Sequence, residues 1–308
     1  QQIKPNTLFC SLFYFVCCRY LYQSLFTQTA AHRRNTMNLK DSLLILLVIS
    51  VWGVNFLFMK LALNEVPPMV VGLLRFFCVV FPTVFLLKRP NVPWHLLAAY
   101  GLTISFGQFG LMFTALDWGL PTGLAALILQ IQVFFTVLIA GVLFREPVHA
   151  HHLMGMCTAA VGLILIGIGH YQGNLSFISM LPVVGAAASW ACGNIIVKRI
   201  GRVNPLSLVV WGSISAFTAF GLVSLALYGT NGRAQHLGNL SWKGIGGILF
   251  LSYVASLVGY TGWGALLARH PAGKITPFAL LVPVVALLVG NMVLNERLGF
   301  WHWLGIAV

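Results

Sequence analysis

An arginine lies well inside an apolar stretch of this chain, where a charge is expensive. Arg75 falls about two helical turns into the segment 69–87, with apolar residues on both sides. If the segment crosses a membrane, a central arginine costs about 2.5–3.5 kcal/mol, so its side chain should face water, a partner or a ligand. Its planar guanidinium can hold a carboxylate through two parallel hydrogen bonds. An arginine that snorkels or binds helix-end carbonyls for structural reasons is an equal alternative.

Three glutamines lie in other apolar stretches. Gln108 belongs to the segment 94–116, and Gln130 and Gln132 belong to the segment 122–144. Their amides offer donors and acceptors to a zwitterion without the desolvation cost of a buried charge. Alternatively they join helices, since polar bonds between membrane helices contribute about 0.6 kcal/mol on average and are often structural. The sequence favours Gln108 and Gln130 as cavity-lining residues, and Gln132 less so.

A tryptophan and an asparagine recur together in two segments. Trp52 is followed by Asn55 and Trp190 by Asn194, at spacings that place each pair on one face of a helix. We expect Asn55 and Asn194 to meet polar groups of a substrate while the indoles wall the cavity. Packing between helices is the alternative, and it is favoured for Trp52 and Trp190 taken alone.

Tyr260 and Trp263 share a helical face in a glycine-rich segment. Gly259, Gly262 and Gly264 flank them, and such glycines let helices approach closely or slide. We therefore expect the two aromatic side chains at the substrate site, as a gate or as part of the cavity wall.

Composition defines the solvent around these residues. Apolar residues make up 59% of the 308 residues and charged residues only 7%, with a mean hydropathy of +0.90; soluble domains carry about 25% charged residues. Apolar runs of about 20 residues without strand-like alternation are typical of membrane-spanning helices. We predict an all-α integral membrane protein with spans at 43–63, 69–87, 94–116, 122–144, 151–169, 179–197, 206–228, 244–267 and 274–294, and a tenth that begins at Phe300 and is truncated.

The second half of the chain repeats the first. At an offset of 150 positions the matches are Pro121 with Pro271, Gly123 with Gly273 and Glu146 with Glu296; at an offset of 138 they are Trp52 with Trp190 and Lys60 with Lys198. An odd number of spans separates equivalent positions, so the copies insert in opposite orientations, as in many transporters. We expect two inverted five-helix repeats, 37–170 and 179–308, the second incomplete.

Basic residues predict the orientation, because Lys and Arg in short loops stay on the cytoplasmic side. The side on which the first span starts holds Arg33, Arg34, Lys40, Lys88, Arg89, Arg145, Lys198, Arg199, Arg202, Arg269 and Lys274, and the other side holds Lys60, Arg233, Lys243 and Arg297. We predict a multi-pass protein of a bacterial inner membrane, with the N terminus of its body in the cytoplasm. The net charge of +13 then reflects topology and attraction to lipid headgroups, and does not indicate nucleic-acid binding.

Other chemistry finds little support in the sequence. Residues 1–36 are expected to be a leader outside the natural protein, because Met37 is a credible bacterial start. The cysteines and histidines of the body lack metal-ligand or disulfide spacing and are expected in packing or in an interfacial polar cluster: Cys78, Cys157, Cys192, His149, His151 and His152. The sequence shows no catalytic set and no cofactor motif. We expect a protein that is not an enzyme, holds no metal or cofactor, and has a small molecule and the lipid bilayer as partners.

Several short runs resemble the EamA family of the drug/metabolite transporter superfamily. They are SVWGVNF at 50–56, GLLRF at 72–76, YGLTISF at 100–106, SWACGN at 189–194, LLVPVV at 280–285 and NERL at 295–298. The resemblance covers about residues 37–308. It implies a ten-helix inner-membrane carrier built from two inverted five-helix repeats, which exports cysteine, O-acetylserine or related amino-acid metabolites from the cytoplasm by alternating access.

Two other functions stay open at this stage. The same fold serves many substrates, so a multidrug or other small-metabolite carrier is one alternative. A membrane sensor or scaffold that binds a ligand without moving it is the other, and directional flux separates it from a carrier. The oligomeric state cannot be read from the sequence.

Overall fold

The computed structural model describes residues 37–118, 120, 122–145, 150–170, 177–238, 240–294 and 298–308. The regular elements within these residues are all helices. Eight of the described helices are long and apolar enough to cross a membrane, and a shorter apolar helix, Leu153–Gly169, stands at the expected fifth span. The prediction of an all-helical membrane fold is confirmed. Residues 1–36, for which we expect a leader, lie outside the described residues.

Several spans are built from more than one element. In chain order the elements are α2 (Leu39–Leu63), α3 (Pro68–Val80), α4 (Thr83–Leu86), α5 (Trp94–Tyr100), η1 (Gly101–Gly107), α6 (Gln108–Asp117), α7 (Thr122–Leu129), α8 (Ile131–Phe144), α9 (Ala150–His170), α10 (Phe177–Ile200), α11 (Pro205–Gly238), α12 (Trp242–Leu249), η2 (Phe250–Tyr260), α13 (Thr261–Arg269), α14 (Ala272–Ile275), η3 (Thr276–Leu281), α15 (Val282–Leu294) and α16 (Phe300–Ala307). Thus α5–η1–α6 forms one span, and α12–η2–α13 forms another.

Polar residues and prolines mark where the helices begin. Asn38 precedes α2 and accepts the backbone N–H of Asp41 at 2.8 Å, and Ser241 caps α12 in the same manner. α3 has Pro68 at its first position, where a missing N–H costs nothing because no helical acceptor is available there. Gly229 divides α11 with a φ of 64°, a left-handed conformation that glycine adopts without strain.

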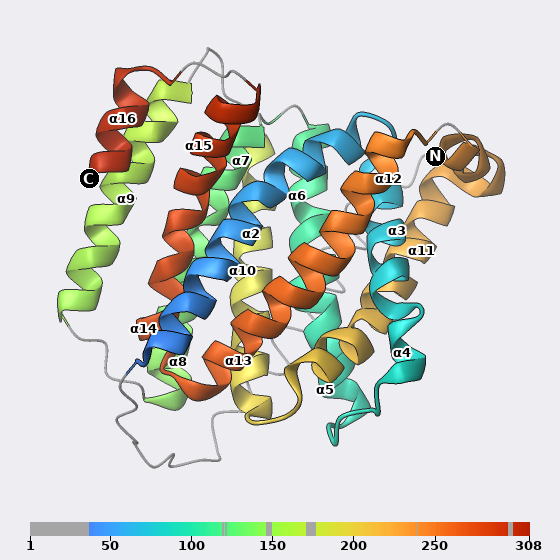
Figure 1. Cartoon of the computed structure of the whole chain (residues 1–308), viewed down its shortest axis with the longest axis horizontal. Coiled ribbons are helices and arrows are strands. Elements are labelled where there is room, and N and C mark those ends of the chain that lie inside the picture. Colours follow the sequence, from blue (N-terminus) through green and yellow to red (C-terminus); the bar gives the residue numbers. More distant parts are fainter. Residues whose placement is uncertain are drawn as a thin grey trace.

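The helices pack in pairs that relate one repeat to the other. α2 packs against α12–η2–α13 and against α15, while α10 packs against α5–η1–α6 and against α8. α3 lies on α11, and α9 lies on α16. Figure 1 shows α9 and α16 side by side at one edge of the molecule and α3 with α11 at the opposite edge. Each of these contacts between the halves has its counterpart with the halves exchanged, as an inverted repeat requires.

The spans in the middle of the bundle depart from regular α-helix. η1 and η2 are π-helical and interrupt equivalent spans of the two repeats. A π-helix leaves some backbone carbonyls without their usual partners, and here side chains of the opposite repeat supply donors. Trp52 Nε1 donates to the carbonyl of Ala255 in η2 at 3.2 Å, and Ser189 Oγ donates to that of Thr103 in η1 at 2.7 Å. The irregular backbone thus joins the repeats.

The outer surface of the bundle is apolar. Large side chains on several helices are exposed, among them Leu46, Leu138, Ile164, Leu222 and Met292. So many exposed apolar side chains would favour aggregation in water, whereas a bilayer solvates them. The surface therefore fits a multi-pass membrane protein, and its polar side chains gather inside.

Candidate functional site

A cavity lies between the two repeats. The space within it, together with its open mouth, is about 550 Å³. Its lining residues come from both repeats: Trp52, Asn55, Phe56, Met59, Arg75, Gln108, Phe109, Met112, Leu129, Gln130, Gln132, Trp190, Tyr260, Ala279 and Val282. These lining residues include no acid and no histidine. The cavity therefore combines one cation, neutral amides and aromatic rings.

Arg75 supplies that cation from the middle of α3. Its side chain is buried, with only 3% of the residue exposed, so it does not snorkel to the outer surface. Its Nε donates to Ser256 Oγ at 2.9 Å, and its guanidinium carbon lies 4.2 Å from the centre of the Phe109 ring. Among the described residues no carboxylate pairs with Arg75. Neither Nη nitrogen makes a hydrogen bond to a described residue, while Ser256 and Phe109 hold the plane of the group.

Four buried polar atoms around the cavity have no hydrogen-bond partner among the described residues. They are Asn55 Oδ1, Gln108 Oε1, Gln132 Oε1 and Tyr260 Oη. Leaving a buried polar atom unpaired costs about 1–3 kcal/mol. All four belong to cavity-lining residues, so a polar ligand or water that entered the cavity would give them hydrogen-bond partners. Three of the four are amide oxygens, which can only accept hydrogen bonds.

Aromatic rings close one side of the cavity. Trp52 lies at their centre, with its ring 5.3 Å from that of Trp190, 5.9 Å from that of Tyr260 and 5.2 Å from that of Trp263, measured between centroids. Gly259 makes this packing possible, because the indole of Trp52 occupies the place of a Cβ at that position. The cluster fixes the size of the cavity with rings whose edges and faces complement one another.

Asn194 and Trp263 lie behind the cavity wall. Trp263 Nε1 donates to Asn194 Oδ1 at 3.0 Å, and Asn194 Nδ2 donates to Thr136 Oγ1 at 3.1 Å. Neither residue lines the cavity. Their hydrogen bonds position the ring of Trp263 against Trp52, so the structure gives both residues a supporting contact with the aromatic wall.

The structure brings together most of the residues that the sequence singles out. Five of the proposed binding residues line the cavity: Arg75, Asn55, Gln108, Gln130 and Tyr260. The three residues left between cavity and packing, Trp52, Trp190 and Gln132, line it as well. Gln132 Nε2 donates to Gln130 Oε1 at 3.4 Å, so these two amides belong to one small network.

The sequence analysis does not predict Ser256 and Phe109 as site residues, although both contact Arg75. Ser256 lies 181 positions from Arg75 and in a π-helical stretch, where α-helical spacing misplaces its direction. Phe109 is one of 22 phenylalanines and has no distinguishing neighbours. The available signal is the run of small and polar residues around Ser252 and Ser256 in an otherwise apolar span.

Comparison with known proteins places the chain in a family. Its sequence matches the model of the EamA-like transporter family over residues 39–168 and 177–308. The chain belongs to this family. The "Probable amino-acid metabolite efflux pump" of Escherichia coli K12 is 39% identical over 277 residues, which cover 88% of this chain and 93% of the relative. The protein of the same name from Salmonella typhimurium LT2 is 41% identical over 267 residues, with coverages of 85% and 89%.

More distant matches agree on the fold. "Protein PecM" of Dickeya dadantii is 25% identical over 263 residues, with coverages of 83% of this chain and 85% of the relative. A crystal structure of a protein 16% identical to this EamA-like transporter superposes with a TM-score of 0.72, covering 88% of this chain and 94% of the other. At that identity the likeness speaks for the fold alone. As an EamA-like transporter, the chain is a multi-pass membrane protein that handles a small molecule.

Proposed function

We propose that this EamA-like transporter exports a small amino-acid metabolite from the bacterial cytoplasm across the inner membrane, with cysteine and O-acetylserine as the first candidates. The names of the two bacterial relatives, both probable amino-acid metabolite efflux pumps, support this substrate class. The observation that carries the proposal is Arg75, a buried cation that lines the cavity and has no carboxylate partner among the described residues. A substrate carboxylate is the partner that its chemistry requires.

In this proposal the carboxylate binds the free edge of the guanidinium. Ser256 already accepts from Nε, so both Nη nitrogens can donate to the two carboxylate oxygens. A hydrogen bond to a charged group contributes about 1.5–3 kcal/mol, roughly twice a neutral one. Arg75 therefore supplies a large part of the affinity, and it selects ligands that carry an anionic group.

The amide oxygens suit the other end of an amino acid. An ammonium has three donors and no acceptor, and Asn55, Gln108 and Gln132 each present an unpaired oxygen. Neutral oxygens accept these bonds without fixing a permanent negative charge in the cavity, so the substrate can leave again. The rings of Trp52, Trp190 and Tyr260 limit the room for a side chain and favour small substrates.

Transport proceeds by alternating access in this proposal. The distribution of Lys and Arg supports a cytoplasmic position for the Asp41 end of α2. The lining residues Trp52 to Met59 lie in the C-terminal half of α2, and Leu129 to Gln132 lie in the N-terminal half of the span formed by α7 and α8. With this orientation both sets lie toward the periplasm, which favours an outward-facing state.

Uptake of labelled O-acetylserine or cysteine into inside-out vesicles tests the proposal. We expect Arg75→Ala to lower the initial rate about tenfold or more, equivalent to about 1.4 kcal/mol, and Arg75→Lys to retain part of it, because lysine keeps the charge but not the fork of donors. Arg89→Ala is the matched control, since Arg89 also stacks on an aromatic ring, that of Trp94 at 4.4 Å, yet does not line the cavity.

Three results would contradict the proposal. Full transport by Arg75→Ala at normal abundance would remove Arg75 from the substrate site. Uptake of cationic or neutral drugs without uptake of amino-acid metabolites would favour the multidrug carrier. Saturable binding without directional flux would favour the sensor.

A further inference from the structure

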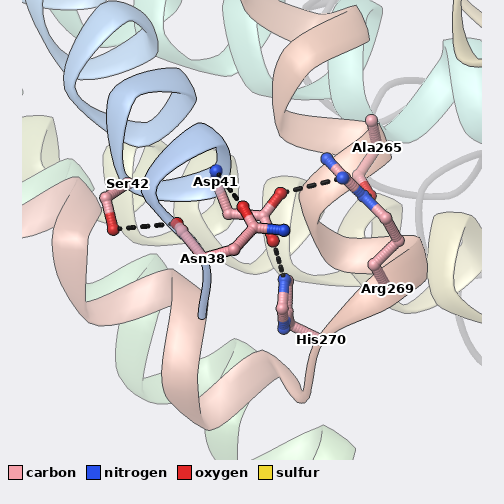
Figure 2. Close-up of polar contacts among 6 residues, drawn as sticks. All are labelled: Asn38, Asp41, Ser42, Ala265, Arg269 and His270. Atoms are coloured by element: carbon pink, nitrogen blue, oxygen red, sulfur yellow. Dashed lines mark hydrogen bonds and ion pairs between the residues drawn. The ribbon is translucent and has the colours of Figure 1, made fainter. Parts of the chain in front are cut away.

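Three side chains meet where α2 begins and α13 ends (Figure 2). Asp41 Oδ1 lies 2.8 Å from Arg269 Nη1, and Asp41 Oδ2 lies 2.8 Å from His270 Nε2. Asp41 and His270 are each 3% exposed. Lys198, near the end of α10, donates from Nζ to the backbone carbonyl of His270 at 2.9 Å. The cluster thus fastens the ends of three helices from both repeats, and it lies apart from the cavity.

A packed apolar layer separates this cluster from the cavity. Asp41 precedes the lining residue Trp52 by eleven positions, which is about 16 Å along a helix. Buried residues fill the interval from both helices, namely Ile45, Val48 and Ile49 of α2 and Leu266 and Leu267 of α13. Val48 and Leu44 pack directly over Gly262 of α13. A metabolite can pass this end only after α2 and α13 separate. The cluster therefore lies where these two helices close the path to the cavity.

One atom of the cluster is left without a partner. An ionised Asp41 can only accept hydrogen bonds, so Nε2 of His270 carries the proton and donates. Nδ1 of His270 is buried and has no hydrogen-bond partner among the described residues. If a second proton binds Nδ1 while this end is closed, it becomes a buried donor without an acceptor. If the helices separate, water accepts from it.

The charges around His270 also disfavour a second proton on it while this end is closed. Asp41 from α2 is the acid that faces His270, and the other charged groups at this end of the packed elements are cations: Lys40 of α2, Arg269 of α13, Lys198 and Arg199 of α10, Arg202 before α11 and Lys274 of α14. Arg269 already neutralises Asp41. A positive charge on His270 in the closed cluster would therefore add to a cationic region, whereas exposure to water would screen it.

We propose that His270 is a proton-binding site of this transporter and that Asp41, Arg269 and His270 form a gate at the end of α2 whose opening the proton favours. A proton from water binds Nδ1 when the gate separates, and it returns to water before the gate closes. Because the proton binds the open state better, acid on this side shifts the population toward that state. The inference rests on the proposed transport cycle, and its test uses a readout that needs no substrate.

The readout is the labelling of a cysteine in the cavity from the Asp41 side. All six cysteines are replaced by alanine and Met59→Cys is added, since Met59 lines the cavity. Inside-out vesicles are treated with a membrane-impermeant maleimide between about pH 5 and pH 8, the range in which histidine changes charge. His270→Gln keeps an amide donor for Asp41 but binds no proton. The labelling ratio of the parent to His270→Gln cancels the pH dependence of the thiol itself.

We expect that ratio to rise about fivefold or more from the alkaline to the acid end, the smallest factor that corresponds to an unpaired buried donor. In the Asp41→Asn variant the cysteine at position 59 should be labelled rapidly at every pH, because His270 and Arg269 have lost their ionised partner. His302→Gln is the matched control: His302 is also buried, but it lies on α16 and its Nδ1 accepts the N–H of Gly299 at 3.0 Å. This control should keep the parent's response.

Two outcomes would overturn the inference, namely a ratio that does not change with pH, or a response that His302→Gln abolishes as fully as His270→Gln does. The two proposals can fail separately. A pH-dependent gate in a protein that moves no amino-acid metabolite would refute the proposed substrate, and metabolite export with a labelling ratio insensitive to pH would refute the gate.

Discussion

The two repeats contain the same pair of packed helices, and the copies agree in their middle parts but differ at their ends. In the first copy α2 packs against α12–η2–α13, and in the second α10 packs against α5–η1–α6. Each copy places a tryptophan against the cavity, Trp52 or Trp190, and each partner span contains a π-helical stretch. Duplication therefore accounts for the backbone that surrounds the cavity.

The ends of the first copy carry ionised side chains that the second copy replaces by neutral ones. Asp41 meets Arg269 and His270 at one end, and Glu65 meets Ser241 at the other. At the offset of 138, Ser179 is equivalent to Asp41 and Val203 to Glu65; at the offset of 150, Leu120 is equivalent to His270. The helix caps differ as well: α5 begins after Pro93, and α12 begins after Ser241.

This difference makes the two membrane faces of the molecule unequal in buried charge. The copies are inverted, so equivalent ends lie at opposite faces of the membrane. One face then closes with a buried charged cluster, and at the other face the equivalent positions hold a hydroxyl and an aliphatic side chain. The proposed proton-binding gate therefore belongs to one face only, because Ser179 and Leu120, which are equivalent to Asp41 and His270, carry no titratable side chain.

The largest effect should follow from removing the buried charge. Asp41→Ala leaves the Nε2–H of His270 without its acceptor, and breaking a buried pair costs about 3–5 kcal/mol. We expect about 3 kcal/mol, the lower bound, because the Arg269 side chain is 39% exposed and can turn to water. Ser179→Ala, at the equivalent position, should lose about 1 kcal/mol. Unfolding in detergent followed by tryptophan fluorescence measures both, and equal losses would contradict the asymmetry.

A smaller difference in stability should distinguish glycine-to-alanine substitutions in the two π-helical stretches. A Cβ on Gly101, at the start of η1, would collide with the backbone carbonyl of Gly212 in α11, which cannot turn aside. A Cβ on Gly259, near the end of η2, would meet the indole of Trp52, a side chain that borders the cavity and can shift toward it. We expect Gly101→Ala to lower the free energy of unfolding by about 1–3 kcal/mol, and Gly259→Ala to lower it less but to slow transport by shifting Trp52 in the cavity.

Gly246→Ala provides the control for these substitutions. No atom lies within 4 Å of a Cβ at Gly246, and alanine favours a helix interior over glycine by about 0.5–1 kcal/mol. This variant should be as stable as the parent or more so. If Gly259→Ala lost more stability than Gly101→Ala, the first π stretch would not be the more rigidly packed of the two.

How far the sequence predicts this structure depends on the level of detail. Apolar length predicts the spans well: 94–116 is expected, and α5–η1–α6 runs from Trp94 to Asp117. The faces of the spans are harder to predict, because lipid and protein core are both apolar and leave no polar face to read. For this reason Asn55 and Asn194 look equivalent in the sequence, although only the first lines the cavity.

The irregular backbone is the second reason why the sequence does not predict all contacts in the site. A π-helical stretch changes which residues share a face, so the contact between Ser256 and Arg75 cannot be obtained from α-helical spacing. The gate cluster is missed for a different reason. Asp41 and His270 are 229 positions apart, and each one alone reads as an ordinary polar residue at a helix end.

The smallest effect should come from the other end of α2, where the charge is exposed. Glu65 accepts hydrogen bonds from the hydroxyl and the backbone N–H of Ser241, at 2.5 and 2.8 Å, and these bonds lower the pKa of Glu65 from its ordinary value of 4.5. A carboxyl whose folded-state pKa is lowered stabilises the fold above its unfolded pKa, and this contribution disappears as the pH falls through the folded value.

Glu65→Gln tests this end without disturbing the cap that Ser241 provides for α12. The difference in melting temperature between the parent and Glu65→Gln should be small and steady near neutral pH, and it should vanish as the pH falls through the lowered pKa of folded Glu65. Salt should also reduce it, since the pair is open to solvent. Ser241→Ala is the comparison variant: it loses the helix cap at every pH and also the hydroxyl that lowers the pKa of Glu65, so part of its loss should persist in acid. A difference that persisted in acid, or that matched the loss in Asp41→Ala, would mean that the two ends of α2 do not differ in the burial of their charges.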